Sequence, residues 1–300
     1  MSGEGSSSAR LGFGCANFSP RMSRAEIVAL LETALDCGLS RFDTARMYDL
    51  GAAESLLGEL ARRRRAEMTI VTKVGISPRC RAERALSKIA ERLLGVRDPG
   101  PFRFGQFSPE QIRKSFETSL RELQTDHVEA LLLHEAGPEE INDDMKRTLT
   151  DLKRSGAVGK LGVATAAKDA AAIAAQHPEL AEIVQITAPA PGAPLPKHDM
   201  LIVHSVLGTR LSHLVARLRA NAELAQRFAS EVGVDGANAE AAARLFLAYE
   251  LGRNPNGVVL FASMHARHIE QNATLLTEKP KAEQIAAFEH FVTSTGAEGS

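Results

Sequence analysis

The sequence predicts a closed (β/α)₈ barrel, a single α/β domain with a long insertion after the third strand. Three observations lead to this fold class. Eight apolar runs of strand length recur along the 300 residues, most of them are continuous, and helical patterns separate them. Strands that alternate with helices form parallel sheets, and eight such units close into a barrel of this size class.

The predicted strands lie at 10–17, 40–45, 68–73, 128–134, 160–165, 182–187, 200–205 and 257–263. Most of them are continuously apolar rather than alternating. A strand buried on both faces has this pattern, as strands of a parallel sheet do. The carboxyl end of each strand is therefore the place to look for functional side chains.

The predicted helices have recognisable starts. Ser23 and Glu26 have the spacing of a capping box. Ser108 precedes a proline, a residue favoured at the first helical position. A third helix is expected over 145–152, where a methionine and two leucines repeat at helical spacing.

Two connections depart from a regular barrel. The segment at about 77–107 is long and rich in arginine, proline and glycine, with a helical pattern at 81–95. Long insertions of this kind usually shape a site, and a disordered segment is the alternative. The stretch 188–199 is rich in proline and is expected to be a loop. Residues 1–9 form a polar tail.

Composition excludes several classes of function. The net charge of −1 provides no field that would recruit nucleic acid or an anionic membrane. The basic run 62–65 is interpreted as a solvated helix end, and only weakly as a phosphate or partner site. Three cysteines form no paired framework and no metal spacing, which favours a reducing compartment. With neither a signal peptide nor an apolar run of about 20 residues, we expect a cytoplasmic protein.

The first strand contains an incomplete dinucleotide-binding fingerprint. Gly12 and Gly14 match its first two glycines, but Asn17 stands where the third belongs. No clear acidic residue closes a second strand about 20 residues later in the way that this motif requires. A Rossmann fold is therefore not predicted.

Four polar residues of reactive type fall at the ends of consecutive predicted strands. Asp43 ends the second strand, and Tyr48 lies in the loop after it. Lys73 ends the third strand and His134 the fourth. Taken singly, each has a structural explanation: a helix cap, a pocket wall, a solvated strand end and a satisfied core histidine. Their joint position at one rim of a barrel instead indicates a catalytic site.

The segments around these residues resemble the aldo-keto reductases, over about residues 11–272. "RFDTARMY" resembles the family's FDTAxxY, and "GAAESLLGE" resembles its GxSExxLG. "TIVTKVG" carries the lysine, and the stretch 108–135 is similar to the family's long signature of helix three and strand four. The resemblance implies a barrel oxidoreductase in which the four polar residues are catalytic.

The residues support this chemistry on their own terms. Reduction of a carbonyl needs a hydride and a proton for the nascent alkoxide. Tyr48 would be the general acid, although an isolated phenol has a pKa near ~10. The ammonium of Lys73, held charged by Asp43, is expected to lower that pKa. His134 would donate a hydrogen bond to the carbonyl oxygen, and a nicotinamide would carry the hydride.

The resemblance also implies cofactor contacts, with departures from the family pattern. Gln185 is similar to the glutamine that binds the nicotinamide carboxamide. Ala164 and Thr165 replace a Ser-Asn pair, and His204 replaces the tyrosine that stacks on the nicotinamide. The remaining expected contacts are Gly14, Cys15, Ser205, Leu207, Ser263, Arg267, His268, Gln271 and Asn272. Arg267 offers a positive charge for a 2′-phosphate, so the expected cofactor is NADPH/NADP⁺, with NADH as the alternative.

The predicted function is reduction of an aldehyde or ketone, or oxidation of the corresponding alcohol or sugar, with a small molecule as the only expected partner and no metal. The changed nicotinamide contacts keep a second class open: a catalytically silent nucleotide-binding barrel that acts as a sensor or regulatory subunit. A hydrolase or isomerase would need a carboxylate pair or phosphate-binding glycines near strands seven and eight. "HSVLGTR" and "FASMHAR" contain neither. Nothing in the sequence selects the substrate or the oligomeric state.

Overall fold

A computed structural model describes residues 10–16, 18–94, 97 and 99–296. Eight parallel strands form a closed barrel in the order β1-β10-β9-β8-β7-β6-β3-β2. They are β1 (Leu11–Gly14), β2 (Arg41–Asp43), β3 (Thr69–Val74), β6 (Val128–His134), β7 (Val158–Ala164), β8 (Ile183–Thr187), β9 (Leu201–His204) and β10 (Val258–Phe261). Each strand overlaps one of the eight predicted runs, which confirms the predicted barrel.

The strands are continuously apolar because both of their faces are covered, as expected. Six of the seven residues of β6 are buried, so both of its faces are covered. β6 pairs in parallel with β3 on one side and β7 on the other. A strand covered on both faces needs apolar side chains at successive positions, because neither face meets water.

The helices are α1 (Arg24–Asp36), α2 (Ala52–Arg64), α3 (Arg81–Leu94), α4 (Pro109–Leu123), α5 (Asp143–Arg154), α6 (Ala167–Gln176), α7 (Gly208–Ala220), α8 (Ala222–Val232), α9 (Ala239–Arg253), α10 (Ala266–Ala273) and α11 (Ala282–Thr295). Short 3₁₀ turns are η1 (Tyr48–Gly51), η2 (Arg65–Glu67), η3 (Pro138–Glu140), η4 (Pro178–Leu180) and η5 (Thr274–Leu276). The expected helix starts before α1 and α4 are confirmed. Ser23 and Ser108 each exchange the two hydrogen bonds of a capping box, with Glu26 and Gln111 respectively.

The insertion after β3 contains a small ribbon and a helix. β4 (Ser77–Pro78) pairs antiparallel with β5 (Phe102–Arg103), and α3 lies between them in the chain. Arg103 of β5 forms an ion pair with Glu83 in the first turn of α3. The helix expected over 81–95 is therefore present as α3, and the proline-rich stretch 188–199 is a loop as expected.

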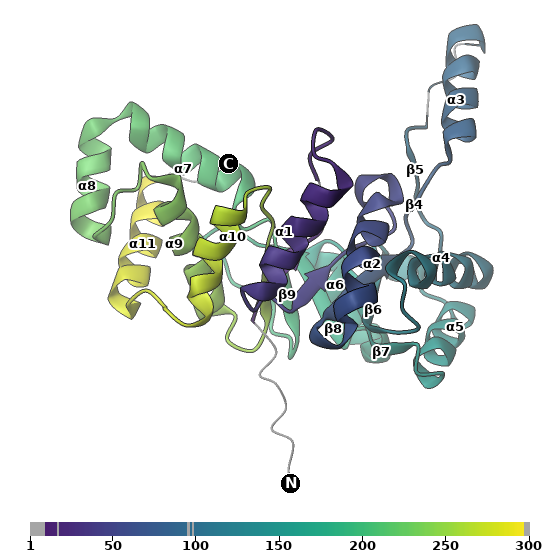
Figure 1. Cartoon of the computed structure of the whole chain (residues 1–300). Coiled ribbons are helices and arrows are strands. Elements are labelled where there is room, and N and C mark those ends of the chain that lie inside the picture. The colour runs from purple at the N-terminus through teal and green to yellow at the C-terminus, as the bar shows by residue number, and fades with distance from the viewer. Residues whose placement is uncertain (1–9, 17, 95–96, 98, 297–300) are drawn as a thin grey trace. The chain divides into compact units, whose positions relative to one another are not determined.

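By its internal contacts the chain divides into two compact units. Unit 1 comprises 1–14, 32–41 and 185–300, and unit 2 comprises 15–31 and 42–184. In unit 2, α2 packs beside α4, and α4 beside α5 (Figure 1). Gly58 explains how closely α2 approaches α4, since a Cβ at this position would lie 2.1 Å from the Glu122 carbonyl oxygen.

In unit 1, α11 packs against α8 and α9 (Figure 1). Aromatic side chains lie between these helices. Phe228 meets Phe291 edge-on at 4.9 Å between ring centroids, and Phe246 meets Phe288 in the same way at 4.9 Å. All four rings are buried. Edge-to-face packing of this kind is the favoured geometry of aromatic pairs, so this cluster is the core beneath these helices.

The basic run 62–65 is only partly the solvated helix end that we expected. α2 ends at Arg64, which pairs with Glu67. Arg65 instead donates hydrogen bonds to the backbone carbonyls of Met68 and His127 and to the carboxylate of Glu129. Its role is therefore structural, since it ties the end of α2 to the start of β6.

The polar tail predicted at 1–9 lies outside the described residues. That the whole chain is a single domain stays a prediction, and so does a cytoplasmic location. Within the described ranges, every helix is too short or too polar to span a lipid bilayer.

Candidate active site

The four predicted catalytic side chains all belong to unit 2. Asp43 is the last residue of β2 and His134 is the last residue of β6. Lys73 is the next-to-last residue of β3, and Tyr48 opens the turn η1. All four thus lie at or just after the carboxyl ends of strands, where barrel enzymes place their chemistry.

Lys73 is the centre of this cluster. Its ammonium donates hydrogen bonds to Asp43 Oδ1 at 2.6 Å, to the Thr44 carbonyl at 3.0 Å and to Tyr48 Oη at 3.1 Å. An ammonium has three donors, so these partners use all of them. The side chain of Lys73 is 1% exposed, and a charge so deeply buried needs this degree of compensation.

The electrostatics of Tyr48 differ from our expectation. Burial is the largest influence and raises the pKa of Tyr48 above its ordinary value, while the charge of Lys73 acts in the lowering direction without prevailing. For Lys73, burial lowers the pKa, but the charge of Asp43 and the contacts with Tyr48 outweigh it, so the pKa lies above its ordinary value. At neutral pH the pair is thus a charged ammonium beside a protonated phenol.

His134 lies beside the phenol. Its ring and that of Tyr48 have centroids 6.0 Å apart and meet edge-on at 89°. The side chain is 9% exposed. After His134 the chain turns sharply through Glu135, which has a φ of +58° and donates its N–H to the Ala164 carbonyl of β7. The histidine is therefore held at the end of its strand.

The turn that presents Tyr48 is strained. Asp49 and Leu50 have φ values of +50° and +57°, in the left-handed region, and Gly51 has +94°. Only the glycine adopts such a conformation without cost. The Asp49 carboxylate accepts a hydrogen bond from the Phe18 N–H at 3.3 Å, which fixes this turn. Backbone strain of this kind is often found at functional sites.

Glu54 of α2 is the centre of a buried ionic network, which could not be predicted from the motif around it. Glu54 accepts hydrogen bonds from Thr72 Oγ1 at 2.7 Å and from the Arg46 guanidinium at 2.8 Å. Glu54 is fully buried. Because Thr72 precedes Lys73 on β3 and Arg46 precedes Tyr48, this glutamate connects the two backbone segments that carry the lysine and the tyrosine.

Three expected cofactor contacts also belong to unit 2, and all are buried. They are Cys15, Ala164 and Thr165. The N–H of Cys15 donates to the Asp43 carbonyl at 2.8 Å, so the chain after β1 is tied to the catalytic strand end. Burial raises the pKa of the Cys15 thiol well above its ordinary value, and this cysteine is not a reactive thiolate.

The other expected contacts belong to unit 1. Gly14 ends β1, and Gln185 is buried within β8. His204 ends β9, with its Nδ1 2.9 Å from the Ser205 hydroxyl. Ser205 has a φ of +59°. This contact with the neighbouring residue holds the His204 ring at the end of β9.

A pocket of about 280 Å³ in unit 1 brings five of the expected residues together. It opens among the first turns of α7 and α9, the start of the loop after β10, and α10. Its lining includes Leu207, Ser263, His268, Gln271 and Asn272, all of them expected cofactor contacts. The resemblance predicted these residues as a set. They come from separate parts of the sequence, and in the structure they line one cavity.

Arg267 is not among the described residues that line this pocket. Its side chain is 73% exposed, and its guanidinium lies 3.0 Å from the carboxylate of Glu240, which does line the pocket. Gln271 donates to the same carboxylate oxygen at 2.9 Å, and His268 Nε2 lies 3.6 Å from the other. One carboxylate thus engages three of the residues expected to meet the adenosine side of the cofactor.

Sequence reasoning missed Glu240. Its only visible feature was its place two residues after Asn238, the residue that caps α9. An acidic residue in a first helical turn is ordinary, because it complements the helix dipole. Glu240 matters for the candidate site because its carboxylate contacts α10, which carries expected cofactor contacts.

The comparison with protein families decides the affiliation of this chain. The model of the Aldo/keto reductase family matches residues 10–188. The chain belongs to this family. Residues 10–188 include all four catalytic candidates of the reductase and Gln185, whereas the pocket with Glu240 lies beyond the matched residues.

Among curated proteins, this chain is 32% identical over 146 residues to Oxidoreductase YdhF of Escherichia coli (strain K12), covering 47% of this chain and 43% of that protein. It is 31% identical over 180 residues to the D-threo-aldose 1-dehydrogenase of Pseudomonas sp, covering 57% and 54%. The chain thus spans about half the length of the curated relatives that it matches.

Solved structures share the fold over nearly the whole chain. An aldo-keto reductase from Klebsiella pneumoniae, in complex with NADPH, has a TM-score of 0.66 at 20% identity, covering 95% of this chain and 90% of that one. The family uses NAD(P)H. The identity is low, so this likeness concerns the fold alone.

Proposed function

We propose that this chain is an NAD(P)H-dependent oxidoreductase that reduces an aldehyde or ketone, or oxidises the corresponding alcohol or sugar, with Tyr48 as the general acid. One observation carries the proposal. The buried ammonium of Lys73 lies 2.6 Å from a carboxylate oxygen of Asp43 and 3.1 Å from the phenolic oxygen of Tyr48. A structural ion pair needs no phenol beside it, whereas proton transfer needs a group that carries the proton.

Each of the four residues has a distinct role in this reaction. A bound nicotinamide supplies or accepts the hydride. Tyr48 gives its proton to the alkoxide oxygen, and the charge of Lys73 stabilises the phenolate that remains. Asp43 holds Lys73 charged and in position. His134 donates a hydrogen bond to the carbonyl oxygen and orients the substrate.

The pocket in unit 1 has the chemistry that a dinucleotide requires. Leu207 and Gly208 place the amino end of α7 at its wall. The first turn of a helix leaves N–H groups without intrahelical partners, and the helix dipole favours an anion there. This end of the pocket suits a phosphate of the cofactor. Ser263, Gln271 and Asn272 would hold the adenosine side, and Gln185 the carboxamide.

Glu240 bears on the choice between NADPH and NADH. A carboxylate accepts hydrogen bonds from ribose hydroxyls, whereas it repels a 2′-phosphate. To pair with that phosphate, the guanidinium of Arg267 would have to break its contact with the Glu240 carboxylate, or bind the carboxylate and the phosphate together. We therefore propose that Glu240 narrows any preference for NADPH over NADH.

The test is turnover of a reactive model aldehyde, 4-nitrobenzaldehyde, followed by the absorbance of NADPH and, separately, of NADH. We expect cofactor oxidation that requires both the aldehyde and the intact Tyr48 hydroxyl. Tight binding of the cofactor without turnover of a broad panel of carbonyls or alcohols would instead support the nucleotide-binding regulator.

A further inference from the structure

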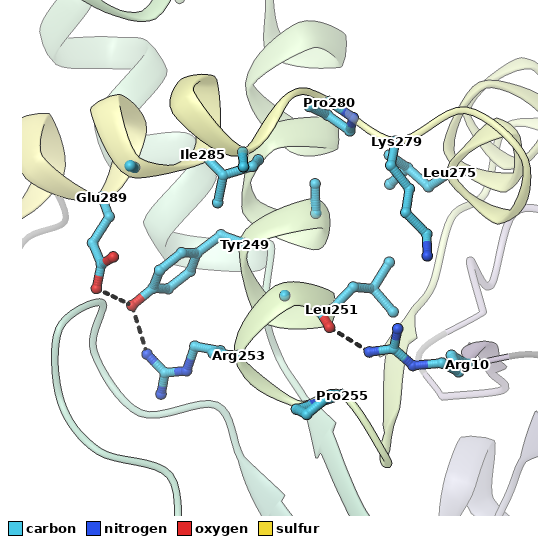
Figure 2. Close-up of a pocket in the computed structure, with 14 residues that line it drawn as sticks. Arg10, Tyr249, Leu251, Arg253, Pro255, Leu275, Lys279, Pro280, Ile285 and Glu289 are labelled. Carbon is cyan, nitrogen blue, oxygen red and sulfur yellow. Dashed lines mark hydrogen bonds between the residues drawn. The ribbon is translucent and has the colours of Figure 1, made fainter.

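A second pocket of about 470 Å³ lies in unit 1 (Figure 2). Arg10, which lines it, directly precedes β1, and Pro255 lies just before β10. The pocket is therefore at the amino ends of these two strands, whereas barrel chemistry takes place at the carboxyl ends. Nothing in the proposed reaction uses it.

The middle of this pocket is apolar. Leu251 at the end of α9, Leu275 of η5 and Ile285 of α11 form its walls, with Pro255 and Pro280 beside them (Figure 2). A cavity of this volume with apolar walls and few polar groups is typical of a site for a small molecule. The apolar body of such a ligand would gain free energy by leaving water.

Two cations line one side of the pocket, as Figure 2 shows for Arg10 and Lys279. The guanidinium of Arg10 donates to the backbone carbonyls of Leu251 and Asn254, the latter at 2.7 Å. These partners fix its position but carry no full negative charge. Among the described residues, neither Arg10 nor Lys279 forms an ion pair with a carboxylate.

The carboxylate that lines the pocket is held at the other end. Tyr249 donates its hydroxyl proton to Glu289 at 3.0 Å and accepts hydrogen bonds from Arg253 Nη1 and from the Gly192 N–H, both at 2.8 Å (Figure 2). Glu289 is therefore fixed away from the Arg10 side, with the positive charge of Arg253 beside it. The cationic side of the pocket keeps an excess of positive charge.

We propose that this pocket binds a small amphipathic anion. Its carboxylate would lie at the side of Arg10 and Lys279, and its apolar body would pack against Leu251, Leu275 and Ile285. A preorganised guanidinium that needs no reorientation is well suited to a carboxylate. None of its lining residues is one of the four catalytic candidates or lines the pocket with Glu240, so this proposal goes beyond the proposed function.

Three probes with one apolar body and different head groups test this proposal: octanoate, octanol and octylamine, each titrated into the full chain by calorimetry. We expect octanoate to bind saturably at one site and to bind at least about tenfold more tightly than octanol, which corresponds to ~1.4 kcal/mol. Octylamine should bind more weakly than octanol, because the cations repel it.

Two variants locate the site. Lys279→Glu should weaken octanoate binding at least about tenfold, while Lys281→Glu, a matched change at an exposed lysine outside the pocket, should leave it unaltered. Ala286→Phe should block binding of octanoate and octanol alike, because Ala286 is exposed on α11 and lines the pocket, so the ring can fill it without disturbing the core.

Unfolding curves of each variant confirm that the fold is kept. The proposal is wrong if octanol binds as tightly as octanoate, or if octanoate binds equally well to the wild type, Lys279→Glu and Ala286→Phe. Binding of octanoate at the catalytic centre would survive Ala286→Phe, so that outcome also contradicts it.

Discussion

The ammonium of Lys73 lies 3.1 Å from the phenolic oxygen of Tyr48, and both groups are protonated in the resting protein. Burial, which disfavours the phenolate, and the lysine charge, which favours it, act on Tyr48 in opposite directions. Burial prevails, so the phenol keeps its proton at neutral pH. A general acid must carry its proton before the reaction begins, and a protonated Tyr48 meets this requirement.

Tyr48→Phe should lower kcat for aldehyde reduction by about two to four orders of magnitude, the usual contribution of a positioned general acid. The Kd of the cofactor should change little, because the hydroxyl acts on the substrate. Steady-state kinetics and a cofactor titration measure the two effects. Equal rates for the variant and the wild type would remove Tyr48 from the mechanism.

Lys73→Met should move the pH profile as well as lower the rate. Without the ammonium, the pKa of Tyr48 rises further, since the charge of Lys73 acts to lower it. Oxidation of an alcohol needs the phenolate as a base, so its kcat/KM rises with pH, and this rise should shift to more alkaline pH in the variant. Lys73→Arg, which keeps the charge, should shift it less. An unshifted profile in Lys73→Met would mean that Lys73 acts on structure alone.

The barrel and the positions of the four catalytic candidates could be predicted because their determinants are local. An apolar run such as 128–134 specifies a buried strand from its own residues, and Ser108 with Gln111 specifies a helix start within four positions. Asp43, Lys73 and His134 then follow from where the strands end. The place of Tyr48 at the site could be predicted only from the family motif around it. The turn that follows contains Asp49 and Leu50 in left-handed conformations, which no local preference predicts.

The ionic contacts at the edge of the proposed cofactor pocket could not be predicted, because they join residues that are far apart in the sequence. Glu240 meets Arg267 and Gln271, which lie 27 and 31 positions further along the chain. The net direction of the pKa of Tyr48 was also wrong in the sequence-based expectation. The neighbouring charge could be anticipated from the sequence, but the depth of burial that outweighs it could not.

Glu240→Gln should tighten the binding of NADPH by about tenfold, which corresponds to ~1.4 kcal/mol, while the binding of NADH stays the same or weakens. The amide keeps the size of the side chain but removes the negative charge, so Arg267 becomes available to a 2′-phosphate. Titrations of both cofactors, and of 2′,5′-ADP against 5′-ADP, measure this without turnover.

Glu223→Gln is the matched control, since Glu223 also lies in the first turn of a helix but is exposed and outside the pocket. In the same assay Arg267→Ala should weaken NADPH and spare NADH. If Glu240→Gln changes the affinities for both cofactors equally, Glu240 does not discriminate between them.

Glu250 should make the stability of the protein depend on pH. Its side chain is 1% exposed, and burial raises its pKa from 4.5 to about 7. Arg253 Nε lies 3.3 Å away and Arg210 also acts to lower the pKa, but Glu250 Oε2 has no hydrogen-bond partner among the described residues, and burial prevails. Deprotonating this carboxyl therefore costs more in the folded protein than in the unfolded chain.

An acid whose pKa is higher in the folded state binds its proton more tightly there, so the free energy of unfolding falls as pH rises from about 4.5 to about 7. Glu250→Gln removes the ionisable group, and with it this fall in the free energy of unfolding. Relative to the wild type, the variant should gain stability above pH 7, by at most about 3 kcal/mol, and gain little near pH 4.5. Urea unfolding at several pH values measures the difference, with Glu278→Gln at an exposed position as the control. A difference between variant and wild type that is constant across this range would show that Glu250 does not titrate as its burial implies.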